Sequence, residues 1–145
     1  MSNKPVATAM KKVLADNYAL YLKTQNFHWN VEGPNFRALH LLFEEQYNDL
    51  AAANDVAAEL IRGLGEKAPG TFDAFNKNTS IKPGNENATA DQMLKDLIKD
   101  QAVMEESLQQ ALEVAQKAGD EVVADFLIER LSVHRKAAWM LKSSM

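Results

Sequence analysis

Hydrophobic residues recur at helical spacing along four long segments of this chain. The first segment runs from about Pro5 to Val31 and ends before the helix-breaking pair Gly33-Pro34. The second follows Asn35, a candidate N-cap, and runs to about Leu64, where Gly65 ends it. In both segments the apolar residues fall on one broad face, as amphipathic helices require. They include Val6, Met10, Val13, Leu14, Leu20 and Phe27, then Leu39, Phe43, Leu50, Ala57 and Ile61.

The middle of the chain, residues 66–88, has no sustained periodicity and holds two prolines and two glycines. Within it we expect a short helical turn over Thr71–Phe75, anchored by Phe72 and Phe75. Beyond it, residues 89–92 (TADQ) form a capping-box pattern, which predicts the start of a third long helix. That helix closes at Gly119, and Asp120 is the predicted cap of a fourth, which carries Val123, Phe126, Leu127, Leu131 and Leu141.

The lengths of the connections predict the topology. The first and second helices are joined by about four residues, as are the third and fourth, so each pair is an antiparallel hairpin. The connection between the pairs is long enough to run back the length of a helix. An up-down-up-down bundle with short loops does not fit that connection. We therefore expect an all-α, ferritin-like four-helix bundle, one domain over residues 1–145, with a short helix in the long crossover between the second and third helices.

Composition narrows the chemistry. The chain has 145 residues, of which 46% are hydrophobic, and no cysteine, which excludes disulfides, zinc–thiolate sites and iron–sulfur clusters. Sixteen basic and twenty acidic residues give a net charge of −4, which argues against binding a polyanion by bulk charge. No segment resembles a signal peptide or a membrane span, and we expect a cytoplasmic protein.

Four chemically active residues share one face of the second helix. At ~100° per residue, His40, Glu44, Asp55 and Glu59 lie within about 100° of one another, and His28 ends the helix before them. Glu44 and Asp55 are nevertheless eleven residues apart, about 16 Å along a helix, far more than a metal–ligand bond can span. The four residues are therefore two unrelated pairs, an ordinary solvated face, or halves of a site completed by another subunit.

The positions of these four residues along the helix favour a site shared by two subunits. The numbers 40 and 59 sum to 99, as do 44 and 55, so two antiparallel copies of this helix would bring His40 to Glu59, and Glu44 to Asp55, of the second copy. One twofold dimer would then contain two identical sites. Imidazoles with carboxylates suit Fe(II), Mn(II) or Zn(II), and the lack of thiolates favours iron or manganese.

The same stretch closely resembles the Dps family, the DNA-binding proteins from starved cells, also called miniferritins. The similarity covers essentially the whole chain and is most specific between His28 and Glu59. It lies in residues 22–31 (LKTQNFHWNV), 33–36 (GPNF), 38–40 (ALH), 43–47 (FEEQY), 55, 58–59 (AE), 61–62 (IR), 64–65 (LG), 67–70 (KAPG) and 139–141 (WML).

This resemblance implies an iron-storage and detoxification protein with ferroxidase activity. It implies a hollow homododecamer in which His28, His40 and Glu44 of one subunit, with Asp55 and Glu59 of its twofold mate, bind iron as catalytic and metal ligands. Fe(II) is expected to be oxidised to Fe(III), preferentially by hydrogen peroxide rather than oxygen, and stored as ferric oxide. Both Fenton reactants would then be consumed without release of hydroxyl radical, which protects against oxidative stress.

Other residues gain candidate roles from the resemblance. Trp29 is a candidate radical trap, although simple packing also explains it, and Gln25 stands where many relatives have a further histidine. Asp120, Asp125 and Glu129 are candidates for an iron-entry pore, although a helix N-terminus alone favours Asp120. Glu45 and Asp49 are candidates for mineral nucleation, for which an ordinary solvated face is an equally good explanation.

Three alternatives remain open to test. A conventional di-iron ferritin would carry Glu-x-x-His motifs, which the sequence lacks. A DNA-compacting protein would need a lysine-rich tail, whereas only Lys4, Lys11, Lys12 and Lys142 lie near the ends, so DNA binding is doubtful. A purely structural bundle leaves the paired numbering unexplained. We expect His134, beside Arg130, Arg135 and Lys136, to be a surface histidine rather than a ligand.

Overall fold

The computed structural model describes residues 3–145 and contains five helices and no strand in that range. The helices are α1 (Lys4–Asn30), α2 (Phe36–Gly63), α3 (Phe72–Asn78), α4 (Ala90–Lys117) and α5 (Glu121–Lys142). The four long helices begin and end close to where the apolar periodicity predicted. The all-α prediction is confirmed.

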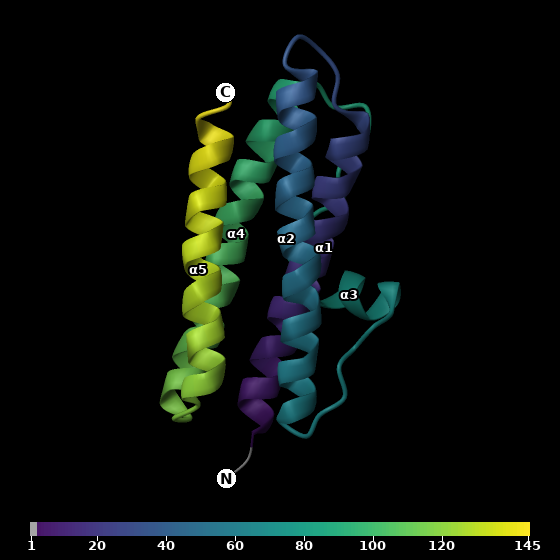
Figure 1. The fold of residues 1–145 in the computed structure, drawn as a ribbon. Coiled ribbons are helices and arrows are strands. Elements are labelled where there is room, and N and C mark those ends of the chain that lie inside the picture. Colours follow the sequence, from purple (N-terminus) through teal and green to yellow (C-terminus); the bar gives the residue numbers. More distant parts are fainter. Residues whose placement is uncertain (1–2) are drawn as a thin grey trace.

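The four long helices form an elongated bundle of two antiparallel hairpins, α1–α2 and α4–α5 (Figure 1). The crossover after α2 returns along the outside of the bundle, so that α4 starts at the end where α2 starts and the two run parallel. The short α3 lies in this crossover, beside α1. This is the topology of the ferritin-like bundle expected from the connection lengths.

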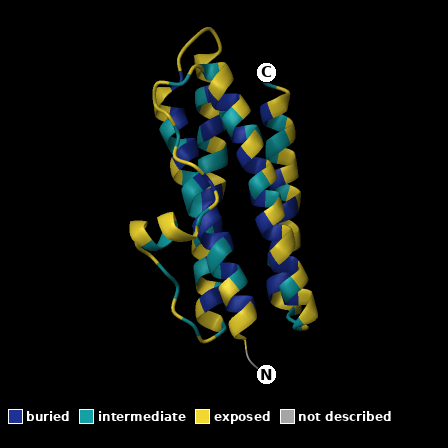
Figure 2. Ribbon diagram, turned by 180° about the vertical axis from the view of Figure 1, so that it is seen from behind, coloured by how far each residue is buried: buried dark blue, intermediate teal, exposed yellow. Residues whose placement is uncertain are grey.

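The core lies between the facing stripes of the long helices, while their outer faces are exposed (Figure 2). Its largest fully buried side chains come from all four long helices, so neither hairpin buries its apolar face alone. They include Leu20, Phe27, Phe43, Ile61, Met93, Leu97, Met104, Leu108, Leu127 and Leu141. Among the described residues, no helix is long and apolar enough to cross a membrane.

The predicted helix ends are mostly confirmed. Thr89 and Gln92 form a reciprocal capping box at the start of α4, and the Asp120 side chain accepts a hydrogen bond from the Val123 N–H at the start of α5. Gly119, with φ of 73°, adopts the left-handed backbone conformation in the turn between α4 and α5. The prediction for Asn35 was wrong in its mechanism: it is the residue before α2, but its side chain makes no capping hydrogen bond.

The crossover is held against α1 by a buried aspartate that the sequence analysis did not single out. Asp16 is fully buried and accepts hydrogen bonds from the Thr79 hydroxyl at 2.8 Å and the Ser80 N–H at 2.7 Å. The expected anchoring role of Phe72 was wrong, because that ring is 78% exposed in the chain. Phe75 does anchor α3, by stacking on Tyr18 with ring centroids 4.8 Å apart.

A buried ion pair joins α1 to α4. Lys23 is 3% exposed, and its Nζ lies 2.8 Å from Asp100 Oδ2 and 3.1 Å from Asp96 Oδ1. Burial raises the pKa of Asp100, and the neighbouring Lys23 ammonium opposes that rise. This pair links α1 of one hairpin to α4 of the other.

Candidate metal centre

His28 and His40 meet at the α1–α2 hairpin. His28 lies in the last turn of α1 and His40 near the start of α2, and the short connection between these helices folds one ring onto the other. The two imidazoles stack with centroids 3.8 Å apart and an interplanar angle of 15°. His28 is 5% exposed, while His40 is half-buried.

Each histidine binds the backbone of the other. His28 Nδ1 lies 2.7 Å from the His40 carbonyl oxygen, and His40 Nδ1 lies 2.7 Å from the His28 carbonyl oxygen. A carbonyl oxygen only accepts, so in each ring Nδ1 carries the proton and donates it. In its neutral form each ring therefore keeps a lone pair on Nε2, the state in which histidine binds metals.

Glu44 completes the cluster within one chain. It follows His40 by one helical turn, and its Oε1 lies 3.9 Å from His28 Nε2. This separation is short enough for one ion to bind both atoms, because metal bonds to histidine nitrogen and carboxylate oxygen are each about 2.0–2.2 Å. The chemistry of the donor set, imidazole with carboxylate, fits a borderline divalent metal such as Fe(II).

Asp55 and Glu59 lie on the same helix but away from this cluster. Both are exposed, and α2 is continuous from Phe36 to Gly63, so Glu44 and Asp55, eleven residues apart, are separated by about 16 Å along the helix. Asp55 lines a surface pocket of about 620 Å³ between α2, α1 and the crossover. Within residues 3–145 of the single chain, no three His, Asp or Glu side chains are arranged to hold a metal ion. The structure thus brings together His28, His40 and Glu44, but not Asp55 and Glu59.

Tyr47 is a neighbour of the cluster that the sequence analysis did not single out. Its ring meets the edge of His28 with centroids 5.1 Å apart. It follows Glu44 by three residues and His40 by seven, a spacing that places all three on one side of α2. This spacing is visible in the sequence, but it does not identify Tyr47 as a site residue, because a tyrosine at helical spacing is equally typical of the hydrophobic core.

The indole of Trp29 is 61% exposed at the end of α1, so it is not packed into the core of its own chain. Gln25, one turn earlier, is half-buried. Whether Trp29 traps radicals stays a prediction.

Two of the three candidate pore residues lie together at the α4–α5 turn. Asp120 and Asp125 line a surface pocket of about 350 Å³ with Glu121 and Ile128. Asp125 and Glu129 are exposed, while Asp120 is half-buried by its capping role. Their function as a pore stays a prediction.

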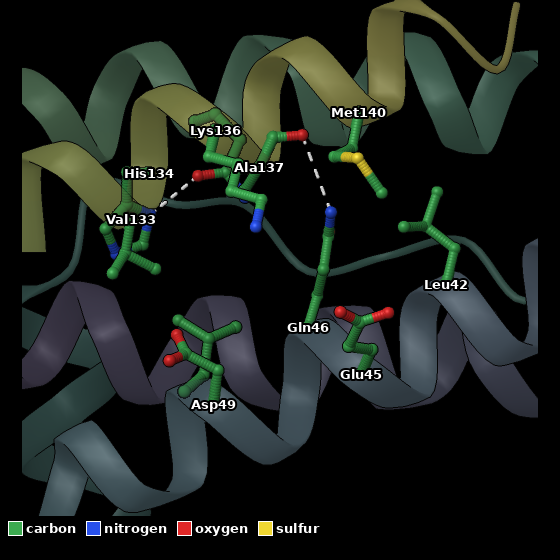
Figure 3. A pocket seen from close by; sticks show the side chains of 11 residues that line it. Leu42, Glu45, Gln46, Asp49, Val133, His134, Lys136, Ala137 and Met140 are labelled. Carbon is green, nitrogen blue, oxygen red and sulfur yellow. Dashed lines mark hydrogen bonds between the residues drawn. The ribbon is translucent and has the colours of Figure 1, made fainter.

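The candidate nucleation residues lie at a pocket of about 240 Å³ between α2 and α5 (Figure 3). Glu45 is exposed there, while both oxygens of Asp49 accept hydrogen bonds from Arg130, at 3.2 and 2.8 Å. Gln46, between them in sequence, reaches across to the Ala137 carbonyl oxygen. A cation at Asp49 would compete with Arg130, which leaves Glu45 the freer carboxylate of the two.

The expectation that His134 lies on the surface was wrong. The residue is 1% exposed, because α5 turns it toward α4, where its Nδ1 lies 2.6 Å from Gln101 Oε1. Its Nε2 lies 3.1 Å from Nη2 of Arg130, which only donates. Burial, and then the charge of Arg130, lower the pKa of His134 to about 3, so the ring is neutral and both nitrogens are occupied.

Comparison with known proteins identifies the family of the chain. Residues 7–145 match the family model of the ferritin-like domain. The chain is 36% identical to DNA protection during starvation protein 2 of Bacillus anthracis over 141 residues, 97% of each chain. It is similar to the structure of Dps from Staphylococcus aureus, with 34% identity, a TM-score of 0.95 and coverage of 99% of this chain and 96% of that one.

A further similar structure carries a description of its chemistry. The Dps protein from Vibrio cholerae O1, described as a member of a broad superfamily of ferritin-like diiron-carboxylate proteins, matches with 28% identity, a TM-score of 0.93 and coverage of 97% of this chain and 89% of that one. Sequence, fold and side-chain chemistry point the same way. This chain belongs to the Dps family of ferritin-like proteins.

Proposed function

We propose that this protein is a ferroxidase that oxidises Fe(II), preferentially with hydrogen peroxide, and stores the product as ferric oxide inside a hollow homododecamer. The observation that carries the proposal is the reciprocal hydrogen bonding of His28 and His40. Because each Nδ1–H is bound to a carbonyl oxygen, two imidazole nitrogens remain without a protein hydrogen bond, and that of His28 lies 3.9 Å from a Glu44 carboxylate oxygen.

The second half of each centre is proposed to come from a twofold-related subunit. Asp55 and Glu59 are exposed on the same continuous helix, about 16 Å from Glu44, so they cannot reach the same ion within one chain. Two α2 helices packed antiparallel around residues 49 and 50 would bring them to His40 and Glu44 of the other subunit. The isologous symmetry of such a dimer gives two identical centres.

The proposed reaction consumes both substrates in a balanced step. Two Fe(II) ions give up one electron each, and hydrogen peroxide takes these electrons with two protons to form two water molecules. Carboxylate ligands favour the Fe(III) product because they bring negative charge to the ion. A two-electron reduction of peroxide leaves no hydroxyl radical, which would explain a protective role under oxidative stress. Oxygen is the alternative oxidant.

The remaining candidate residues fit into the same proposal. Asp120, Asp125 and Glu129 would attract Fe(II) to a pore, Glu45 and Asp49 would nucleate mineral, and Trp29 would intercept radicals. The names of the relatives include DNA protection. With a net charge of −4 per chain, we propose that this protein protects by removing iron and peroxide in the cytoplasm rather than by coating DNA.

Stopped-flow oxidation of Fe(II) by peroxide tests the proposal. In the double variant Asp55→Ala/Glu59→Ala two ligands themselves are removed. Its rate of Fe(II) oxidation should therefore fall by more than the roughly 10–100-fold that follows loss of an outer-shell partner of a metal ligand. Its matched control, Asp73→Ala/Glu113→Ala, removes two exposed carboxylates from other helices and should keep the wild-type rate. Equal rates for the two variants would overturn the proposal.

A further inference from the structure

All three tyrosines of the chain lie in one file of aromatic rings that starts at His28. Tyr47 meets His28 with ring centroids 5.1 Å apart, Tyr21 meets Tyr47 at 6.1 Å, and Tyr18 meets Tyr21 at 5.4 Å. Each of these contacts is edge-on, with interplanar angles of 65°, 63° and 70°. Contacts between aromatic rings therefore connect His28 to Tyr18 without a break.

Helix geometry builds this file from two elements. Tyr21 and His28 are seven residues apart on α1, and Tyr18 precedes Tyr21 by three, so the three share one side of that helix. Tyr47 comes from α2 and fills the gap between Tyr21 and His28. All three tyrosines are half-buried, an environment that holds the rings in place while leaving part of each reachable.

The far end of the file opens onto surface pockets. Tyr18 lines a pocket of about 420 Å³ beside the crossover. It also lines the pocket of about 620 Å³ that contains Asp55, which would face the twofold mate in the proposed dimer. Beyond Tyr18 the next ring is Phe75, at 4.8 Å. A phenylalanine ring is far harder to oxidise than a phenol, so the readily oxidised part of the file runs from Tyr47 to Tyr18.

We propose that Tyr47, Tyr21 and Tyr18 form an electron relay that completes the reduction of peroxide when a centre holds only one Fe(II). This inference rests on the proposed function, because it needs Fe(II) and peroxide at the His28 cluster. Tyr47 is the donor nearest the cluster, and the electron deficit then moves through Tyr21 to Tyr18, where a small reductant can enter the pocket beside the crossover. The relay thereby keeps a half-filled centre from releasing hydroxyl radical.

The step balances in atoms and electrons. Fe(II) gives one electron and becomes Fe(III), and the Tyr47 phenol gives one electron and its hydroxyl proton and becomes a tyrosyl radical. Hydrogen peroxide takes both electrons, that proton and one more from solvent, and its O–O bond breaks to give two water molecules. Reduction of the Tyr18 radical by a small reductant such as ascorbate, with uptake of a proton, restores the phenol.

The two tryptophans offer a competing path. Trp29 and Trp139 are 61% and 62% exposed in the chain, and Trp29 adjoins His28 in sequence. Tryptophan is also oxidisable, so the radical must be assigned to a residue type. Incorporation of ring-deuterated tyrosine does this, because it narrows the electron paramagnetic resonance spectrum of a tyrosyl radical and leaves that of a tryptophanyl radical unchanged.

The experiment loads the assembled protein with one Fe(II) per centre, adds peroxide and freezes the mixture within milliseconds for electron paramagnetic resonance. Wild-type protein should give a radical that narrows with deuterated tyrosine. Tyr47→Phe keeps the ring and removes the phenol, and should lose most of that signal. Tyr18→Phe should keep the initial signal but slow its decay with added ascorbate. Trp139→Phe is the matched control and should behave as wild type.

Several outcomes would overturn the relay. They are an undiminished tyrosyl signal in Tyr47→Phe, a signal that disappears only in Trp29→Phe, or decay with ascorbate that is unchanged in Tyr18→Phe. The same wild-type samples loaded with two Fe(II) per centre separate the two proposals. Rapid oxidation of Fe(II) there, with no tyrosyl radical in the half-loaded sample, would reject the relay and support the ferroxidase. Failure of that oxidation would reject both.

Discussion

The three histidines of this protein occupy two regions with opposite chemistry. At the α1–α2 hairpin, His28 and His40 each donate Nδ1–H to a carbonyl oxygen and keep Nε2 free of a hydrogen bond, and Glu44 lies 3.9 Å from that of His28. Between α4 and α5, both nitrogens of His134 are taken by Gln101 and Arg130. The first region presents ligands, whereas the second is closed and holds helices together.

This difference is set by the partners of each ring rather than by burial. His28 is nearly as buried as His134, at 5% against 1% exposed. A carbonyl acceptor fixes one tautomer and leaves the second nitrogen free, whereas an amide on one side and a guanidinium on the other consume both. A buried histidine is therefore a candidate ligand only when one nitrogen lacks a protein partner.

The largest effect expected from this comparison is on iron chemistry. His28→Ala/His40→Ala removes both open nitrogens and should slow Fe(II) oxidation by more than about 100-fold, the upper range for loss of an outer-shell partner. His134→Gln should keep the wild-type rate, because its ring holds no free nitrogen. Stopped-flow kinetics with peroxide checks both variants. If the His134→Gln variant assembled normally but oxidised Fe(II) slowly, the two regions would not differ in the way described.

A smaller effect is expected on stability, and only in the closed region. The pKa of His134 is about 3 in the folded chain against an ordinary value of 6.5, so below pH 6.5 the unfolded chain binds a proton that the folded chain refuses. The free energy of unfolding should therefore fall as the pH falls, with a contribution from this group of about 2 kcal/mol per subunit between pH 7 and pH 5.

Urea unfolding of wild-type protein and His134→Gln at the two pH values measures this contribution. Glutamine does not titrate, so the variant should lose about 2 kcal/mol less than wild type between pH 7 and pH 5. At pH 7 it should be less stable than wild type by about 1–3 kcal/mol, since one buried polar partner is left unsatisfied. Parallel pH profiles for the two proteins would show that His134 is not held neutral.

Much of the fold could be predicted from the sequence, because the apolar periodicity and the residues at helix ends agree with the overall arrangement. The capping box at Thr89 and the Gly119–Asp120 turn define helix ends through backbone chemistry that needs no distant partner. The crossover was harder, since Asp16 anchors it from more than sixty residues away. Phe72 was mispredicted for a similar reason. A phenylalanine suggests burial, but whether other residues cover its ring depends on the path of the crossover, and the ring is exposed.

The candidate site shows a similar division. The stripe from His40 to Glu59 follows from helical periodicity, and the short connection between the first two helices brings His28 to its start. The tautomers of the two histidines could not be predicted, because they depend on carbonyls brought close by the hairpin. His134 was misplaced because its neighbours in sequence, Arg135 and Lys136, are exposed, whereas the partners that bury it come from α4 and from one turn earlier on α5.

The claim that two subunits share each centre is tested most directly by mixing two inactive variants. His28→Ala/His40→Ala and Asp55→Ala/Glu59→Ala are unfolded together, refolded as mixed assemblies and assayed for Fe(II) oxidation by peroxide. A mixed dimer places the intact histidines opposite the intact carboxylates in one of its two centres. The mixture should regain rapid oxidation that neither variant shows alone. Mixed assemblies that form but stay inactive would contradict it.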